Sequence, residues 1–427
     1  MQLESRYNIA KYIMAFSGVQ GLNIAIGIVR TKLVALLLGP NGMGIISLYN
    51  SAIQMIQNLT NMGLDKSGMP TISTEFRDTA IPQSRDSALC RFRSLIAMAA
   101  LMAVICGVAL SWLLSVIAFG DTSRTLHFIV LSPVAALLIV AGGEVLVLKA
   151  ARRLRTVAVL SLWNVVLALV ISVPLFYIWK YRAIIPSLIL TALVQMAVTI
   201  VYSYRRYPLH FSLSRETIRQ GMPMIRLGMT FVVACGMTTG AEFLIRSFLN
   251  NEGGDTVVGL YNTAYMIAIT YGGMIFASID SEYYPRLCQI AHDDVKMLKA
   301  TVLRQIRMSL TFIIPMIIVM ELLLPWIVPL LFSDRFVDAI PITQIAILSL
   351  LFRAVYLPIG YVPLSRGDSR TFLLMESIGA VMLLLCVVLG YNLNGLVGAG
   401  IGLVVSNAFD MVNYMIICHK RYGIKLK

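Results

Sequence analysis

Long apolar runs, separated by short polar breaks, constrain this chain more than any other feature. Of its 427 residues, 58% are hydrophobic and only 13% are charged, whereas soluble domains carry about 25% charged residues. A run of about 20 apolar residues is long enough to cross a lipid bilayer as a helix. The pattern therefore excludes a soluble globular enzyme and a disordered protein, and it predicts an all-α polytopic membrane protein.

The run lengths and the breaks between them predict about twelve transmembrane helices. Gly39-Pro40-Asn41-Gly42 is typical of a tight turn, because Gly and Asn accept a positive φ and Pro cannot continue a helix. Asn392-Leu393-Asn394-Gly395 separates the last two runs in the same way. The predicted spans are roughly 12–38, 42–66, 94–118, 126–149, 156–179, 183–204, 221–249, 256–284, 305–332, 338–363, 370–391 and 395–418.

The positive charges fall almost entirely on alternate loops. The chain has 35 Lys and Arg residues against 21 Asp and Glu residues, a net charge of +14. All but nine of those cations lie in the terminal segments or in loops on the same face. The nine are Arg124, Lys180, Arg182 and Arg335 on the other face, and Arg30, Lys32, Arg226, Arg246 and Arg353 inside predicted spans. Because cytoplasmic loops are enriched in Lys and Arg, we expect both termini to be cytoplasmic. The excess charge is a topology signal, and no nucleic-acid partner is expected.

A short internal repeat indicates duplication. Leu48-Tyr49-Asn50-Ser51-Ala52 recurs as Leu260-Tyr261-Asn262-Thr263-Ala264, almost half a chain later, and each copy opens the second helix of its half. This predicts two six-helix bundles, residues 1–220 and 221–427, related by a parallel repeat. Two such bundles with a site between them are a recurrent transporter design. The repeated Asn50 and Asn262 are candidate substrate-binding residues.

Ionisable residues inside the spans are the other candidates, because such groups are costly in lipid and usually face a cavity or a partner. Arg30 has no acid within a helical turn, so it needs a ligand or an interhelical partner. Glu242 and Arg246 are spaced to pair on one helix face. Arg353, Glu321 and Asp410 lie at similar depths, either as a structural ion pair or as cavity residues. We expect the acids near cytoplasmic helix ends to reach water. These are Asp65, Glu144, Asp280, Glu282 and Glu376.

Arginine in a cavity suits an anionic substrate, because its fork of donors matches phosphate oxygens and stays charged when poorly solvated. The candidate substrate-binding cations are Arg30, Lys32, Arg246 and Arg353, and Glu242, Glu321 and Asp410 are candidates for ion coupling or ion pairing. The sequence contains no GxxxxGK[ST] and no HExxH motif. We therefore expect no cofactor, no metal site and no enzymatic activity.

The opening segment resembles a known family. Phe16-Ser17-Gly18, Ile28-Val29-Arg30-Thr31-Lys32, Leu37-Leu38-Gly39-Pro40-Asn41-Gly42-Met43-Gly44 and Leu48-Tyr49-Asn50 resemble the start of Wzx-type polysaccharide flippases. These flippases belong to the multidrug/oligosaccharidyl-lipid/polysaccharide exporter (MOP) superfamily. The match at the level of motifs covers about the first 70 residues, and the layout of spans extends it over the chain.

The resemblance implies a V-shaped pair of bundles around a central cavity, working by alternating access in the bacterial inner membrane. It implies a substrate of undecaprenyl-diphosphate-linked oligosaccharide, an O-antigen-like unit used in lipopolysaccharide biosynthesis. Arg30 and Lys32 match the first-helix cations thought to meet the diphosphate in that family. Implied partners are membrane lipids, a polysaccharide polymerase and a chain-length regulator.

Two other functions fit part of the pattern. An ion-coupled small-molecule exporter of the same superfamily would share the fold, although the drug-antiporter branch tends to have an acid in the first helix, where this chain has Arg30. A membrane-embedded glycan polymerase or ligase usually carries a large outer loop, and the predicted outer loops are short.

Overall fold

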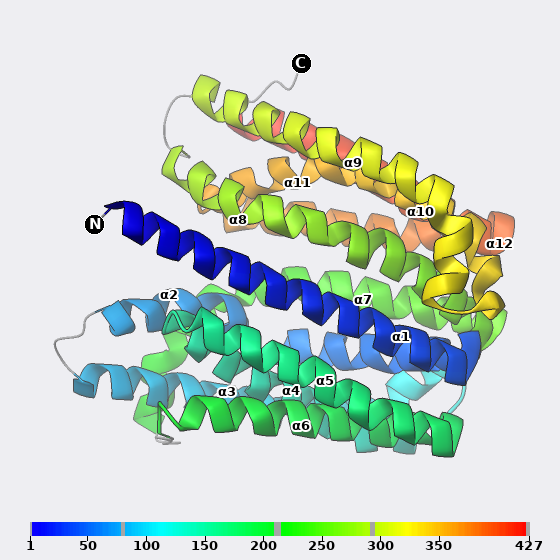
Figure 1. Ribbon diagram of the computed structural model, residues 1–427, viewed down its shortest axis with the longest axis horizontal. Coiled ribbons are helices and arrows are strands. Elements are labelled where there is room, and N and C mark those ends of the chain that lie inside the picture. Colours follow the sequence, from blue (N-terminus) through cyan, green and yellow to red (C-terminus); the bar gives the residue numbers. More distant parts are fainter. Residues whose placement is uncertain (1, 78–81, 209–214, 291–294, 424–427) are drawn as a thin grey trace. The chain divides into compact units, whose positions relative to one another are not determined.

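The computed structural model describes residues 2–77, 82–208, 215–290 and 295–423. In this part of the chain the structure consists of helices and contains no strand. In chain order they are α1 (Gln2–Thr60), α2 (Leu64–Arg77), α3 (Pro82–Phe119), α4 (Thr125–Ala150), α5 (Leu154–Trp179), the 3-10 helix η1 (Lys180–Ala183), α6 (Ile184–Tyr204), α7 (Arg215–Tyr265), the π-helix η2 (Met266–Tyr271), α8 (Gly272–Ile290), α9 (Val295–Leu331), the 3-10 helix η3 (Asp334–Ala339), α10 (Ile340–Ile347), α11 (Ser349–Ser365) and α12 (Ser369–Tyr422). Figure 1 traces them along the sequence.

Among the described residues, seven stretches of helix are long and apolar enough to cross a membrane, and a bent pair, Asp334–Ile347 with Ser349–Ser365, makes an eighth. Four of the seven contain a break, at Gly39, at η1, at Gly254 and at Asn394-Gly395. Divided at these breaks, the eight stretches become the twelve helical segments that the sequence predicts. The predicted all-α polytopic membrane fold is confirmed.

Three of the breaks lie on glycines with positive φ, at 64° for Gly39, 79° for Gly254 and 55° for Gly395. Only glycine adopts such angles without steric cost, so the chain leaves the helix there. Beyond the last break, α12 folds back on itself. A Cβ added to Gly390 would lie 2.2 Å from the carbonyl oxygen of Gly398, so the two halves of α12 touch through bare backbone.

The described residues form two compact units. Unit 1 comprises Met1–Leu38, Ala52–Val116 and Gly120–Val232, and unit 2 comprises Gly39–Ser51, Ile117–Phe119 and Val233–Lys427. In unit 1, α4 packs against α2 and α6, and α5 packs against α6. In unit 2, α11 packs against α8, α9 and α12, and α10 packs against α9 and α12. The expected division at residues 220 and 221 stays a prediction.

A buried ion pair ties unit 1 together. The Arg93 guanidinium donates from Nε and Nη2 to the two carboxylate oxygens of Glu144, at 2.8 and 2.9 Å. It also donates to the carbonyl oxygens of Tyr207 and Pro208, and the Ser203 hydroxyl donates to Glu144 at 2.6 Å. Arg93 and Glu144 are each only 4% exposed. The expectation that Glu144 reaches water is therefore wrong, because α3 brings it a guanidinium that satisfies both of its oxygens.

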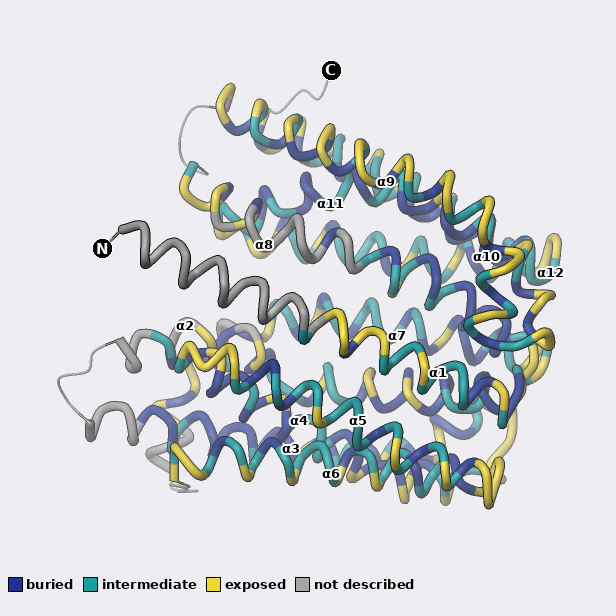
Figure 2. The backbone as a smooth tube through the Cα atoms, in the orientation of Figure 1, coloured by how far each residue is buried: buried dark blue, intermediate teal, exposed yellow. Residues whose placement is uncertain are grey.

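In unit 2, the burial pattern of α9 indicates where lipid lies. One side of this helix is buried and the other is exposed, which Figure 2 shows as a dark blue and a yellow stripe. The exposed side carries large apolar residues such as Phe312, Leu322 and Trp326. An apolar stripe open to the surroundings suits contact with lipid chains, since it would be costly in water. The buried side faces a core that contains Tyr283, Leu298, Val302, Ile359, Val362, Met375, Tyr414 and Cys418.

The two copies of the internal repeat share a burial pattern, and the helical segments that lead into them cross within unit 2. Tyr49 and Tyr261 are both fully buried. Gly44 lies against the second copy's helix so closely that an added Cβ would be 2.0 Å from the carbonyl oxygen of Asp255. A Cβ on Gly259 would lie 2.0 Å from the carbonyl oxygen of Pro40. The two repeat helices therefore cross backbone to backbone, which only glycine permits at both positions.

Candidate functional site

Unit 2 contains a polar cavity of about 250 Å³ inside its membrane helices. Its lining comes from α7, η2, α11 and both halves of α12. The lining residues that carry polar groups are Thr238, Glu242, Tyr265, Arg353, Tyr356, Glu376, Ser406, Asn407, Asp410 and Tyr414. The π-helix that follows Tyr265 contributes Ile269, and single π turns inside helices occur often at functional sites.

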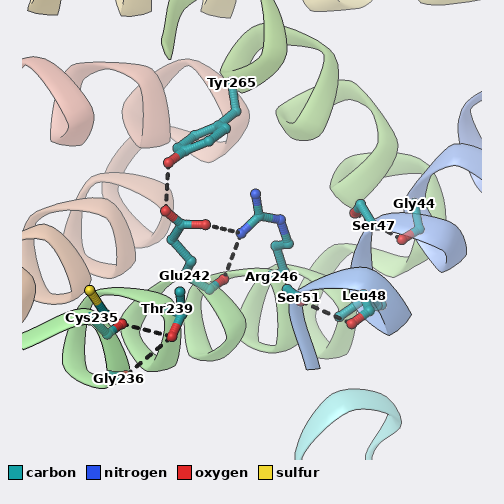
Figure 3. A network of polar contacts seen from close by, with 10 residues as sticks. All are labelled: Gly44, Ser47, Leu48, Ser51, Cys235, Gly236, Thr239, Glu242, Arg246 and Tyr265. Carbon is teal, nitrogen blue, oxygen red and sulfur yellow. Dashed lines mark hydrogen bonds and ion pairs between the residues drawn. The ribbon is translucent and has the colours of Figure 1, made fainter. Parts of the chain in front are cut away.

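One wall of the cavity is the carboxylate of Glu242 on α7, shown in Figure 3. Tyr265 donates its hydroxyl hydrogen to Glu242 Oε1 at 2.6 Å. Arg246, one turn along α7, donates from Nη1 to Glu242 Oε2 at 3.3 Å and to the Glu242 carbonyl oxygen at 3.1 Å. The Arg246 guanidinium also lies 5.0 Å from the centre of the Tyr265 ring. Glu242 and Arg246 thus form the pair that their spacing allows, and tyrosine completes it.

Another part of the lining is built by two tyrosines that hold polar partners. Tyr414 donates to Glu376 Oε1 at 2.9 Å, and Tyr356 donates to Asn407 Oδ1 at 3.1 Å. The two tyrosine rings pack edge to face, with centroids 5.3 Å apart. Because Glu376 and Tyr414 lie on the two halves of α12, their hydrogen bond joins the helix that approaches the break to the helix that leaves it.

Asp410 also lines the cavity. Its Oδ1 atom is buried and has no hydrogen-bond partner in the described part of the chain. The carboxylate rests against Gly379, where an added Cβ would lie 2.9 Å from Oδ1. Arg353 also has a buried Nε without a partner in that part, and its guanidinium lies 5.9 Å from the centre of the Phe276 ring. Arg353 and Asp410 are therefore both open to a partner.

The charge in the cavity lining is acidic. Three carboxylates, Glu242, Glu376 and Asp410, line it together with one guanidinium, Arg353. Arg246 offsets Glu242 directly at 3.3 Å. Even so, more negative than positive groups face the space when all are ionised, so the cavity suits a proton or a small cation better than an anion.

Arg30, in unit 1, has a different environment. It lies in the part of α1 that precedes Gly39, and its Nε donates to Ser172 Oγ of α5 at 3.1 Å. No carboxylate of the described residues forms an ion pair with it. Lys32, two residues further on, is half-buried. Arg30 thus keeps most of its donors and all of its charge available.

The structure brings only some of the predicted site residues together. Glu242, Arg353 and Asp410 line the cavity of unit 2, and Arg246 forms an ion pair with Glu242. The other predicted residues, Glu321 on α9 and the repeated Asn50 and Asn262, are not part of its lining.

Among the cavity residues, Glu376 is the most important one that the sequence analysis did not predict as a site residue. The sequence places it near a cytoplasmic helix end, with access to water. The structure shows it half-buried, lining the cavity beside Tyr414, because α12 reverses its direction. A signal was present in the sequence, since Glu376, Asp410 and Tyr414 are spaced almost symmetrically about the Asn394-Gly395 break.

The family follows from a comparison with known sequences. A family described as "Polysaccharide biosynthesis protein" matches residues 33–341 of the chain. The chain belongs to this polysaccharide biosynthesis protein family. The resemblance of the opening segment to a polysaccharide family is thereby confirmed at the level of family. A comparison with curated proteins found no match to this chain.

Solved structures share the fold of this polysaccharide biosynthesis protein over nearly its whole length. One is the inward-facing conformation of a multidrug resistance MATE family transporter of the MOP superfamily. It is 16% identical, with a TM-score of 0.77 and 94% of each chain covered. Another is the lipid II flippase MurJ in an inward closed conformation, at 12% identity, a TM-score of 0.67 and coverage of 94% of this chain and 87% of that one.

A third is a MOP superfamily transporter from Pyrococcus furiosus whose binding pocket is described as having reverse polarity. It is 14% identical, with a TM-score of 0.67 and coverage of 96% of this chain and 93% of that one. At these identities the likeness shows the fold, which is that of MOP superfamily transporters.

Proposed function

We propose that the protein is a flippase that moves an undecaprenyl-diphosphate-linked oligosaccharide, an O-antigen-like unit, from the inner to the outer leaflet of the bacterial inner membrane. The observation that carries the proposal is the match to the polysaccharide biosynthesis family over residues 33–341, in a chain with a transporter fold. The flippase MurJ, with the same fold, supports a lipid-linked substrate.

The head group of such a substrate is a diphosphate, and Arg30 is the group that we assign to it. Arg30 sits in a membrane helix with only a neutral hydroxyl as partner among the described residues. A guanidinium without a carboxylate retains affinity for phosphate oxygens, which it binds through two parallel N–H groups. Lys32 adds a second positive charge on the same helix, while the prenyl chain stays in lipid.

The acidic cavity of unit 2 supplies the coupling step in this proposal. Binding of a proton or a small cation at Glu242 or Asp410 neutralises part of the excess negative charge there. A site whose occupancy differs between inward-open and outward-open states shifts the balance between them. Alternating access then returns the empty flippase to its inward-open state. Both chain termini lie in the cytoplasm in this proposal.

The test is the substitution Arg30→Ala in cells that depend on this gene for surface polysaccharide. We expect loss of surface polysaccharide and accumulation of the lipid-linked unit on the inner leaflet, at unchanged protein abundance in the membrane. The matched control is Arg182→Ala, which removes an exposed arginine and leaves polysaccharide unchanged. Normal polysaccharide in the Arg30→Ala strain would refute the role of this residue.

An ion-coupled small-molecule exporter is the second candidate, and the acidic cavity of unit 2 is the observation that favours it. Carboxylates and aromatic rings together suit organic cations, and Tyr265, Tyr356 and Tyr414 line the same space. Deletion of the gene separates the two functions. A rise in drug susceptibility with intact surface polysaccharide supports the exporter, and the reverse supports the flippase.

A further inference from the structure

Among the described residues of unit 1, three hydrogen bonds connect the first part of α1 to α5 and η1 in parallel order along the chain. Asn23 Nδ2 donates to Ser161 Oγ at 2.8 Å, and Arg30 Nε donates to Ser172 Oγ at 3.1 Å. At the end of the series, the Tyr181 hydroxyl donates to the carbonyl oxygen of Leu38 at 2.9 Å. The middle bond is the one that involves a charged group, so α5 holds a guanidinium at a defined place.

The hydroxyl of Ser172 has a fixed direction. Ser172 is fully buried, and it donates its single hydrogen to the carbonyl oxygen of Ala168 at 2.6 Å. A hydroxyl has one donor and two acceptor lone pairs, so with its hydrogen engaged it is left as an acceptor. Ser172 therefore receives the Nε–H of Arg30, and the backbone of α5 sets the direction from which it does so.

The hydrogen bond from Arg30 Nε to Ser172 leaves the two terminal nitrogens of the guanidinium without a partner among the described residues. The guanidinium is planar, and a partner on Nε fixes that plane while the two terminal nitrogens stay available. Those nitrogens make no hydrogen bond to the residues that the structure describes. Two terminal nitrogens in a fixed plane match two oxygens of a phosphate group.

We propose that Ser172 is a positioning residue for the diphosphate head group, acting by holding the guanidinium plane of Arg30. The inference rests on the proposed function, since it assigns to Ser172 the task of presenting Arg30 to that substrate. Holding the side chain in its binding orientation before the ligand arrives lowers the entropy lost on binding. Ser172 itself does not touch the substrate.

The experiment measures the affinity of the purified full-length protein, in lipid nanodiscs, for undecaprenyl diphosphate. We expect Ser172→Ala to weaken binding about tenfold, because a hydrogen bond to a charged group is lost. Ser172→Thr keeps the hydroxyl and should bind within about twofold of the unaltered protein. If Ser172→Ala fails to fold in a thermal unfolding assay, Ser172→Cys replaces it, because it keeps the shape with a weaker acceptor. Unchanged affinity in the folded variant would overturn the proposal.

A double-mutant cycle separates positioning from a structural role. If Ser172 acts through Arg30, the double variant Arg30→Ala/Ser172→Ala binds no more weakly than Arg30→Ala alone. The matched control is Ser161→Ala, which removes the equivalent hydroxyl that serves Asn23 and should leave diphosphate affinity unchanged. Additive losses in the double variant, or an equal loss in Ser161→Ala, would show a packing role and overturn the inference.

The two proposals fail in different ways in this experiment. If Arg30→Ala binds undecaprenyl diphosphate as well as the unaltered protein does, the assignment of Arg30 to the substrate fails, and this inference with it. If Arg30→Ala loses binding and Ser172→Ala does not, only the positioning role fails.

Discussion

Two arginines of unit 1, Arg93 and Arg30, show opposite uses of the same side chain in a membrane protein. Arg93 gives hydrogen bonds to both oxygens of Glu144 and to two backbone carbonyls, and lies 4.7 Å from the centre of the Tyr204 ring. Among the described residues, Arg30 has a single neutral partner, Ser172. A guanidinium in which all three nitrogens donate to the protein holds helices together, whereas one whose two terminal nitrogens are free is available to a ligand.

The largest expected effect tests this difference through stability. Arg93→Ala leaves the Glu144 carboxylate buried without its counter-charge, which should cost about 3–5 kcal/mol of the free energy of unfolding. Arg30→Ala leaves no charge uncompensated, so its unfolding temperature in detergent should stay at or above that of the unaltered protein. Equal destabilisation by both substitutions would contradict the comparison.

Arg353 in unit 2 lies between these extremes, because it faces carboxylates without forming an ion pair shorter than 4 Å in the described structure. Arg353→Ala removes the only positive charge among the described residues of the cavity lining, and we expect a loss of about 1–3 kcal/mol in stability at neutral pH. Adding Asp410→Asn should recover part of that loss, because one repelling carboxylate is removed. Thermal unfolding of both variants measures it. Arg353→Lys keeps the charge and serves as control, and a double variant less stable than the single one would rule out electrostatic coupling.

The smallest expected effect on stability concerns Asp368, which lies outside the membrane spans. Its carboxylate accepts several hydrogen bonds. It caps α12 by accepting from the Thr371 backbone N–H at 3.1 Å, and it accepts from the Tyr422 hydroxyl at 2.8 Å and from Arg421 Nε at 3.1 Å. Partial burial acts to raise the pKa of this carboxyl, but the hydrogen bonds from Thr371, Tyr422 and Arg421 outweigh it and lower the pKa from 3.8 to about 2.

A lowered pKa in the folded state means that the ionised form stabilises the fold. The contribution of Asp368 is therefore complete above pH 3.8 and is lost as the pH falls toward 2. The unfolding temperature of Asp368→Asn should lie slightly below that of the unaltered protein at neutral pH, and the gap should narrow as the pH drops through this range. A gap independent of pH would show that the carboxylate charge plays no part. The loss is small because the Arg421 side chain is 60% exposed and its ion pair is screened by water.

The sequence determined the fold class and the number of helical segments. Apolar runs of spanning length, and turn residues such as Gly39-Pro40 and Asn394-Gly395, specify where each helix lies and where it ends, because backbone groups in lipid must be satisfied within the helix. The repeated Leu-Tyr-Asn segment predicted a duplication, and in the structure a helix break precedes each copy, at Gly39 and at Gly254. The pairing of Glu242 with Arg246 followed from their spacing along one helix.

Tertiary structure decided which charges are used and which are free. Glu144 and Glu376 look alike in sequence, as acids near helix ends, yet one is paired with Arg93 in a closed network and the other lines a cavity beside Tyr414. The sequence placed Arg93 in a loop and Arg30 in a span, and only the structure shows that α3 brings Arg93 to Glu144. It also shows that α5 offers Arg30 a hydroxyl, with no carboxylate partner among the described residues. The reason is physical. A charge in a membrane acquires its role from the partners that other helices bring to it, and those partners are remote in the sequence.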